Sequence, residues 1–232
     1  MTKFIKILLC LSTLSLVAQN NFNQFDDKGE RHGPWRKFFK NTNAIRYSGT
    51  FDHGKEVGEF LFYTLKSNKS VLTSSKVFNI NNNLAQVKFF ASNGTLISEG
   101  QMNGRLHVGP WVYYHKNSKV VMTEEFYDNE GKLNGLRTTY YRNSKIASEV
   151  SYKNGLKQGM SKSYSQSGIL INKINYEAGE MDGIAEFYNE GGQLLRKGKY
   201  LNGLKHGYWL EYENQQLVNE LLYYYGSLQD NN

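Results

Sequence analysis

Short segments in which apolar and polar residues alternate recur through the second half of the chain. Three of them read "IASEVSY" (146–152), "LINKINY" (170–176) and "LLRKGKY" (194–200). Ile146, Val150 and Tyr152 share one face, and Leu170, Ile174 and Tyr176 do the same in the next segment, which is the pattern of a β-strand with one buried face. The pattern therefore predicts a chain built from strands.

Pairs of glycines separated by three residues divide these strands into units. The second glycines recur about every 24 residues, with one gap of twice that length that contains Asn81 and Ala85 in place of the glycines. The pairs are Gly29/Gly33, Gly54/Gly58, Gly131/Gly135, Gly155/Gly159, Gly179/Gly183 and Gly203/Gly207, and Gly104/Gly109 is the same pair with one residue inserted. A fixed period of this length is the signature of a repeat architecture, and about eight units fill the chain from Asp27 to Tyr224.

Aromatic residues occupy one fixed place in every unit, five residues after the second glycine. They are Phe38, Tyr63, Phe90, Tyr114, Tyr140, Tyr164, Tyr188 and Tyr212. Turn residues follow four positions later, such as Gly168 or the pair Asn143-Ser144. Each unit is therefore predicted to be a β-hairpin, and the glycines allow positive φ or a close approach at the crossing between hairpins. We expect an all-β fold, an elongated antiparallel sheet of about eight hairpins, with an irregularity or kink at the third unit.

Three units carry a resemblance to a known repeat. They read "YLNGLKHGYWLEY" (200–212), "YKNGLKQGMSKSYSQSGIL" (152–170) and "YEAGEMDGIAEFYNEGGQL" (176–194). These segments resemble MORN repeats, in the variant form of bacterial proteins named as the YwqK-type antitoxin family. The resemblance implies successive hairpins without enzymatic activity and a binding or scaffolding role, with attachment to membranes or proteins.

The first residues are typical of a secretory signal peptide. Lys3 and Lys6 precede an apolar run of about a dozen residues, which is too short to span a bilayer. We therefore predict a signal peptide at 1–19, a short linker at 20–26, the repeat domain at 27–226 and a polar tail at 227–232. The mature protein would be periplasmic, outer-membrane associated or extracellular. The single cysteine, Cys10, would leave with the signal peptide, so no disulfide is expected.

Charge and motifs give little indication of catalysis. The 28 Lys and Arg and 21 Asp and Glu residues are scattered singly, which favours a solvated face over a surface for an anionic ligand. Nucleophile elbows, phosphate loops and zinc-protease motifs are absent from the sequence. Glu124 and Glu125 are adjacent on a predicted strand, so they point to opposite faces and are expected to be solvated charges. We predict a protein that is not an enzyme and that has no cofactor.

The histidines are expected to be structural. His32 and His206 stand one residue before a second glycine, and His107 stands two before. These three belong to the first, last and fourth units, so they are too far apart to share a metal ion. His53 and His115 occupy other positions in their units. We therefore predict loop-capping or exposed histidines and no metal site.

Aromatic rows are the candidates for binding. One row, two residues after the second glycine, holds Trp35, Phe60, Trp111 and Trp209, and a second row holds Tyr63, Tyr114, Tyr140, Tyr164, Tyr188 and Tyr212. The rings of the first row either pack as the sheet core or form a partly exposed row that contacts a ligand. Gly33, Gly58, Gly109, Gly135, Gly159, Gly183 and Gly207 are assigned structural roles.

These observations predict an exported, non-catalytic repeat protein that forms an interaction or scaffolding surface for an envelope or extracellular protein. The alternatives are a peripheral phospholipid-binding module, a carbohydrate or cell-wall binding protein, and an antitoxin-like binder of a toxin. A nucleic-acid partner is not expected.

Overall fold

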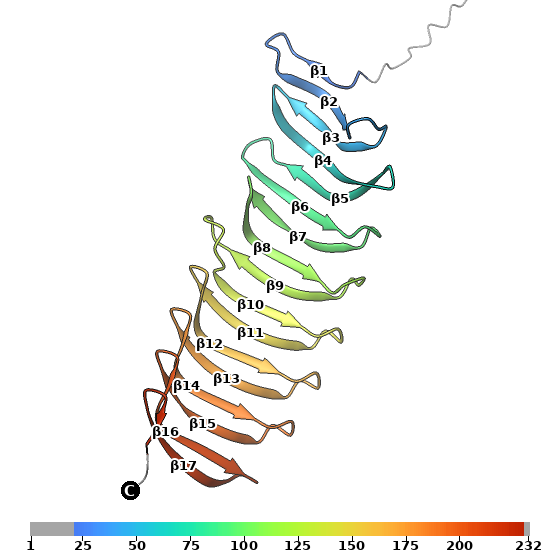
Figure 1. Cartoon of the computed structure of the whole chain (residues 1–232). Helices are drawn as coiled ribbons and strands as arrows, with labels where there is room; N and C mark the ends of the chain where they lie inside the picture. Colours follow the sequence, from blue (N-terminus) through green and yellow to red (C-terminus); the bar gives the residue numbers. More distant parts are fainter. Residues whose placement is uncertain (1–20, 230–232) are drawn as a thin grey trace, which may run out of the picture.

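The protein is a single layer of antiparallel strands arranged in the order of the sequence (Figure 1). The computed structural model describes residues 21–229, so the predicted signal peptide at 1–19 and the last three residues of the predicted tail lie outside it. The first nine strands are β1 Gln24–Phe25, β2 Arg31–Phe38, β3 Ile45–Asp52, β4 Lys55–Lys66, β5 Lys69–Phe78, β6 Leu84–Phe90, β7 Leu96–Asn103, β8 Leu106–Tyr114 and β9 Val121–Tyr127. The other nine are β10 Gly135–Tyr140, β11 Ile146–Lys153, β12 Leu156–Tyr164, β13 Leu170–Glu177, β14 Glu180–Tyr188, β15 Leu194–Leu201, β16 Leu204–Glu213, β17 Gln216–Tyr224 and β18 Ser227–Leu228.

Each strand pairs only with the strands before and after it in the sequence. Hairpins such as β2–β3 and β16–β17 are the eight predicted units, and the all-β repeat fold is confirmed. The sheet begins at Gln24, inside the predicted linker, and ends at Leu228, inside the predicted tail. None of the residues that the structure describes forms a helix of the length and hydropathy needed to cross a membrane.

The two glycines of each pair occupy different structural positions at the crossings between hairpins. The first lies in a tight turn, as at Asn154-Gly155, where φ is +53° and +84°. Positive φ at both central residues is the type I′ turn that suits the twist of a hairpin. The second lies in a bulge where one residue of a strand faces three of the next, as between the pairs Val150–Ser161 and Tyr152–Lys157. Gly159 has φ +77° there, so the predicted need for a positive φ is confirmed.

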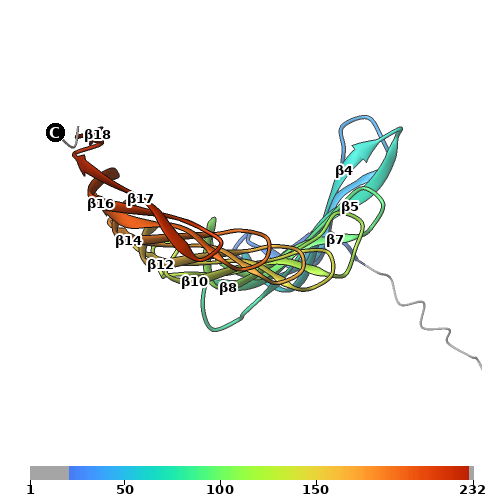
Figure 2. The same cartoon turned by 90° about the horizontal axis from the view of Figure 1, so that it is seen from below.

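The aromatic residue five positions after the second glycine marks a second bulge in every hairpin. Tyr164 pairs with Leu170, and the register shifts immediately before it. The other seven pairs follow the same rule, and in each the partner is aliphatic: Phe38–Ile45, Tyr63–Leu72, Phe90–Leu96, Tyr114–Val121, Tyr140–Ile146, Tyr188–Leu194 and Tyr212–Leu217. The repeat thus preserves two bulges per unit, which bend and twist the strands. Seen along its length, the sheet is bowed like a trough (Figure 2).

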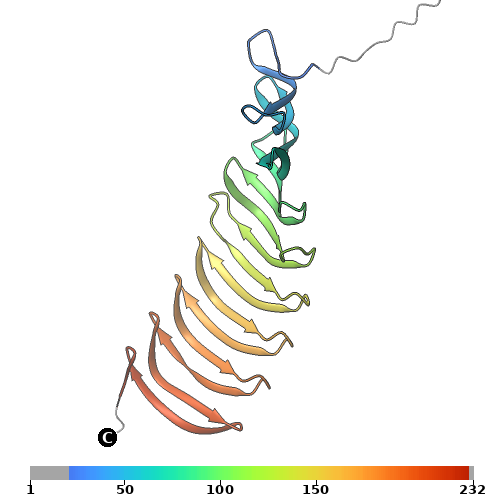
Figure 3. The ribbon, with the colours of Figure 1, turned by 45° about the vertical axis from the view of Figure 1, so that its right-hand side comes forward.

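At the third unit the sheet changes direction, but its strands remain regularly hydrogen-bonded. The β5–β6 pair keeps one uninterrupted register from Ser74–Phe89 to Phe78–Ala85, so this crossing lacks the bulge of the others. In Figure 3 the blue and teal strands before it are viewed nearly edge on, whereas the strands from β7 onward are viewed face on. The expected irregularity is therefore a change in the direction of the sheet, and the loss of both glycines leaves the ladder itself intact.

Candidate binding surface

The row of residues two positions after each second glycine forms the centre of one face, which we name the ladder face. Phe60, Trp111 and Trp209 are only 0–1% exposed. Each lies over a glycine of the preceding strand. A Cβ atom added to Gly49, Gly100 or Gly198 would lie 2.2–2.4 Å from the ring above it. The rings occupy the space that those side chains would fill.

The indole nitrogens fix the tryptophan rings on the preceding strand. Trp111 Nε1 donates to the Gln101 carbonyl at 2.9 Å, and Trp209 Nε1 donates to the Lys199 carbonyl at 3.1 Å. Trp35 does the same to Gln24 at 3.2 Å and remains half-buried. Buried indoles need such a partner, because an unpaired N–H away from water is costly.

The interpretation of this row as core is therefore correct for Phe60, Trp111 and Trp209, and the interpretation as an exposed row is wrong for them. A ring with no exposed surface has no area left for a ligand. The sequence does contain an indication that these rings are buried, which is a glycine 11 residues before each of them. Gly49, Gly100 and Gly198 precede Phe60, Trp111 and Trp209 by that spacing. These glycines lie outside the glycine pairs and were missed.

Basic residues in the spacer between paired glycines cover the ladder face. The Arg31 guanidinium lies 3.9 Å from the centre of the Phe51 ring, and Lys205 Nζ lies 4.6 Å from that of Trp209. His107 stacks on Trp111 with the ring centres 3.7 Å apart, and its burial lowers the pKa of its imidazole. Cations over ring faces are favourable contacts. Several charges that were expected to be solvated therefore cover aromatic rings.

The adjacent glutamates confirm that neighbouring positions serve opposite faces. Glu125 is buried on the ladder face, where it accepts a hydrogen bond from Tyr127 at 2.6 Å and pairs with Arg137 Nε at 3.2 Å. Glu124 points to the other face and accepts from Tyr140 at 2.6 Å. They form no facing carboxylate pair, as predicted, but Glu125 is a buried charge, which corrects the expectation that both are solvated.

The other side of the sheet, which we name the outer face, carries the predicted tyrosine row. Tyr114 donates to Glu99 at 2.5 Å, Tyr164 donates to Glu149 at 2.9 Å, and Tyr188 donates to Glu186 at 3.0 Å. The hydrogen bonds to Glu99 and Glu124 raise the pKa of Tyr114 and of Tyr140 to about 12. These rings are half-buried, so their hydroxyl groups are held by neighbouring carboxylates while part of each ring remains accessible.

A charged row runs beside these tyrosines. Glu186 lies between Lys173 and Lys197 at 3.4 and 3.2 Å, and Lys88 pairs with Glu99 at 3.5 Å. Burial opposes ionisation of Glu186, but hydrogen bonds from Lys197, Tyr188 and Lys173 together lower the pKa of its carboxyl. The row is mixed in sign and internally paired, so it offers no broad field for a single kind of ion.

Exposed apolar residues form a stripe on the outer face of the last four units, one position after the second glycine. In the last four units these residues are between 43% and 58% exposed: Leu136, Met160, Ile184 and Tyr208. They lie two strands apart, a spacing of about 10 Å. We call these four residues the outer stripe. Sequence reasoning missed them because it followed the aromatic residues and not the single positions beside the glycines.

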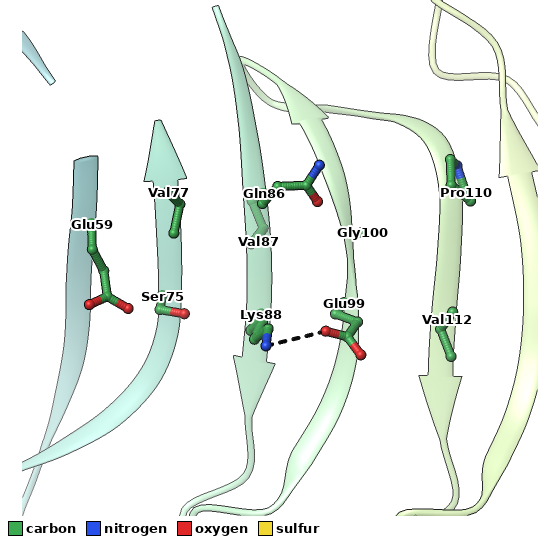
Figure 4. A pocket seen from close by; sticks show the side chains of 10 residues that line it. All are labelled: Glu59, Ser75, Val77, Gln86, Val87, Lys88, Glu99, Gly100, Pro110 and Val112. Carbon is green, nitrogen blue, oxygen red and sulfur yellow. Dashed lines mark ion pairs between the residues drawn. The ribbon is translucent and has the colours of Figure 1, made fainter. Parts of the chain in front are cut away.

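A shallow hollow of about 350 Å³ lies on the outer face between β4 and β8 (Figure 4). Glu59, Val77, Gln86 and Pro110 line it, and the Lys88–Glu99 ion pair crosses its floor. Ser75 also lines it. The hollow can hold part of a partner's side chain.

Two of the histidines cap loops, as predicted. The backbone N–H of His53 faces His32 Nδ1 at 3.5 Å, and that of Tyr225 faces His206 Nδ1 at the same distance. Gln158 and Asp182 fill this position in other units and accept the equivalent N–H at 3.2 Å. The place before the second glycine is therefore a capping position that several acceptors fill.

The repeated hairpins match a known family model in two places. The model is described as MORN repeat variant, and it matches residues 133–154 and 181–202. The first segment spans the β10–β11 hairpin and the second spans β14–β15. No curated protein matches the chain. The two matched hairpins are thus similar to MORN repeat variants and lie in an all-β meander, which is consistent with a non-catalytic repeat protein that binds membranes or proteins.

Proposed function

We propose that this is an exported scaffold protein whose outer face binds a protein of the cell envelope. The observation that carries the proposal is the outer stripe, four large apolar side chains that recur at one position of consecutive units and remain exposed. Apolar residues that line up on a surface and are flanked by polar ones are typical of protein interaction sites.

The surroundings of the stripe favour a protein over a lipid surface. The charged row beside it is mixed in sign, with Glu186 between two lysines, so it lacks the excess of positive charge that attracts anionic lipids. Apolar side chains at intervals of about 10 Å with paired charges between them are suited to a repetitive or extended partner. Many weak contacts along such a surface give useful affinity without a single deep pocket.

The test is a comparison of two triple variants of the tagged chain in affinity capture from envelope extracts. Leu136, Met160 and Ile184 are replaced by lysine in the first variant. The control replaces Ile97, Ile171 and Leu195 by lysine, which are apolar residues of similar exposure at the hairpin bulges. We expect a saturable protein partner that the first variant loses and the control keeps.

Other results assign the outer face differently. Equal capture by both variants would contradict the role of the stripe. Binding to anionic phospholipid vesicles that weakens with salt, or binding to soluble glycans with quenching of tryptophan fluorescence, would replace the protein partner with one of those ligands. A captured toxin would give the narrower antitoxin role. Cell fractionation with the signal segment deleted tests export.

A further inference from the structure

Four titratable side chains from different elements meet at the N-terminal end of the sheet. His32 is on β2, Asp52 ends β3, His53 lies in the turn before β4, and Asp26 follows β1. His32 Nδ1 lies 3.6 Å from Asp52 Oδ1, and His53 Nε2 lies 3.8 Å from the same oxygen. One ligand atom from each of His32, Asp52 and His53 lies within 4.8 Å of the other two.

A nearly buried carboxylate orients the His53 ring. Asp26 Oδ2 lies 2.5 Å from His53 Nδ1, and the Asp26 side chain is only 10% exposed. Its other oxygen accepts the backbone N–H groups of Lys28 and Glu30, both at 2.9 Å. With Nδ1–H donating to Asp26, the lone pair of Nε2 is directed away from it, on the side of Asp52. A carboxylate behind a histidine is the usual second partner of a metal-binding imidazole.

The turn at His53 does not select one residue type. His53 has φ +44°, and the equivalent turns hold Asn154, Ala178, Asn202 and Tyr225 at φ +44° to +53°. Histidine, asparagine and aspartate are all enriched in this left-handed conformation. The turn therefore accepts an imidazole without requiring one, and the contact of His53 with Asp26 is additional to the turn.

The last unit shows that loop capping alone does not need this cluster. His206 caps the final crossing with the same 3.5 Å contact as His32, but its ring faces Tyr224 and Tyr225 and no carboxylate. At the first crossing, the rings of His32 and His53 lie 4.7 Å apart with Asp52 between their nitrogens. The acidic groups are thus an addition to the capping geometry.

We propose that His32 Nδ1, His53 Nε2 and Asp52 Oδ1 bind a divalent transition-metal ion such as Zn²⁺, with Asp26 as a positioning residue. On binding, the single lone pair of His32 Nδ1 exchanges its long 3.5 Å contact with the His53 N–H for the metal. Tetrahedral ligands at 2.0–2.1 Å from zinc are about 3.4 Å apart, so closing the present 3.6 and 3.8 Å separations needs only small side-chain movements. Two imidazoles and one carboxylate suit such ions better than Mg²⁺ or Ca²⁺, and the exposed side leaves a position for water. The sequence predicted no metal site because it compared histidines at equal positions and not across one crossing.

The test measures metal binding to the whole chain without a polyhistidine tag. Zn²⁺ is titrated by calorimetry, and Co²⁺ is followed by its visible absorption, which is intense for tetrahedral coordination. We expect one ion per chain and a higher melting temperature with Zn²⁺. His53→Asn introduces the residue found in the equivalent turns at Asn154 and Asn202, so it should fold and lose binding. His206→Asn is the matched control and should bind as the native chain does.

A second variant tests whether Asp26 orients a metal-binding histidine or whether Zn²⁺ binds only to unconnected surface residues. Asp26→Asn should weaken binding about 10- to 100-fold, as loss of a second partner does at other metal-binding histidines. The proposal is overturned if His53→Asn binds Zn²⁺ as tightly as the native chain, if the two asparagine variants at 53 and 206 weaken binding equally, or if Co²⁺ keeps its pale octahedral spectrum with the native chain.

Discussion

The last unit and the one before it solve the same packing problem in opposite ways. In the β15–β16 pair, Trp209 lies over Gly198, and both are buried. In the β13–β14 pair, the corresponding residues are Ala185 and Ile174, and Ala185 has no exposed surface. A large residue faces a glycine in one unit, and a small residue faces a branched one in the other. The comparison teaches that the repeat preserves the volume of the pair and not the identity of either residue.

The strongest test of this comparison replaces the Trp209–Gly198 pair with the alanine and isoleucine of the preceding unit. Gly198→Ile should drive a side chain into the Trp209 ring and lower the free energy of unfolding by about 1–3 kcal/mol or more. Trp209→Ala should empty the site and lower it by about 3–5 kcal/mol. The double variant reproduces the Ile174–Ala185 pair, so it should recover at least about 2 kcal/mol relative to the sum of the single changes. Denaturant unfolding followed by circular dichroism measures the cycle, and strict additivity would disprove the volume rule.

A charged pair in the middle of the row sharpens the comparison. Arg137 takes the position of the tryptophan and Glu125 the position of the glycine. Glu125→Ala should cost about 2–3 kcal/mol, because it leaves Arg137 and Tyr127 without their partner on a covered face. Glu124→Ala, on the outer face, is the control and should cost under about 1 kcal/mol. Equal losses in chemical denaturation would show that the two faces are not distinct.

Two glycines are required for different reasons, one for its backbone conformation and the other for the space that a side chain would occupy. Gly159 has φ +77° and open space where a Cβ atom would lie, whereas Gly198 lies in ordinary strand geometry beneath a ring. Gly159→Ala should therefore cost about 1–2 kcal/mol through the left-handed backbone alone. Gly159→Asn should cost less, because asparagine tolerates that conformation. Identical melting temperatures for both variants would contradict this explanation.

The smallest expected effect is a pH dependence on the outer face. The carboxyl of Glu186 has a lowered pKa in the folded chain, so its contribution is complete above its ordinary value of 4.5 and is lost as the pH falls through the lower folded value. Glu186→Gln should flatten that part of the stability profile, lowering the melting temperature most at neutral pH and least at acidic pH, where the native carboxyl is also neutral. Melting curves of both proteins across the acidic range check this, and parallel profiles would refute it.

The sequence was sufficient for the repeat, because glycine at a left-handed position and an aromatic residue at a bulge are each nearly irreplaceable in their place. Gly159 and Tyr164 therefore appear at fixed spacing and reveal the hairpin. The partner across the sheet was harder to predict. Two extra residues at the β15–β16 crossing displace the register, so the pairing of Trp209 with Gly198 follows only after the bulge is known.

The candidate surfaces could not be predicted for the same reason, because the strand register at the crossings cannot be read from the sequence. The outer stripe consists of ordinary residues such as Leu136 and Ile184, whose exposure follows from the bulge beside them and not from their chemistry. His32 and His53 are 21 residues apart, and only the crossing of two strands brings them together. Local pattern predicts each hairpin well, whereas sites that join neighbouring hairpins require the geometry of the crossing.

Pairing of each strand only with its sequence neighbours has a consequence for how the chain acquires its structure. Hairpins such as β10–β11 close contacts within about 20 residues, and each completed hairpin offers an edge to the next. Structure can therefore grow from one end at the pace at which the polypeptide emerges from a ribosome or a translocation pore. A chain that emerges one end first could therefore fold hairpin by hairpin, and only a short segment would be unfolded at any time.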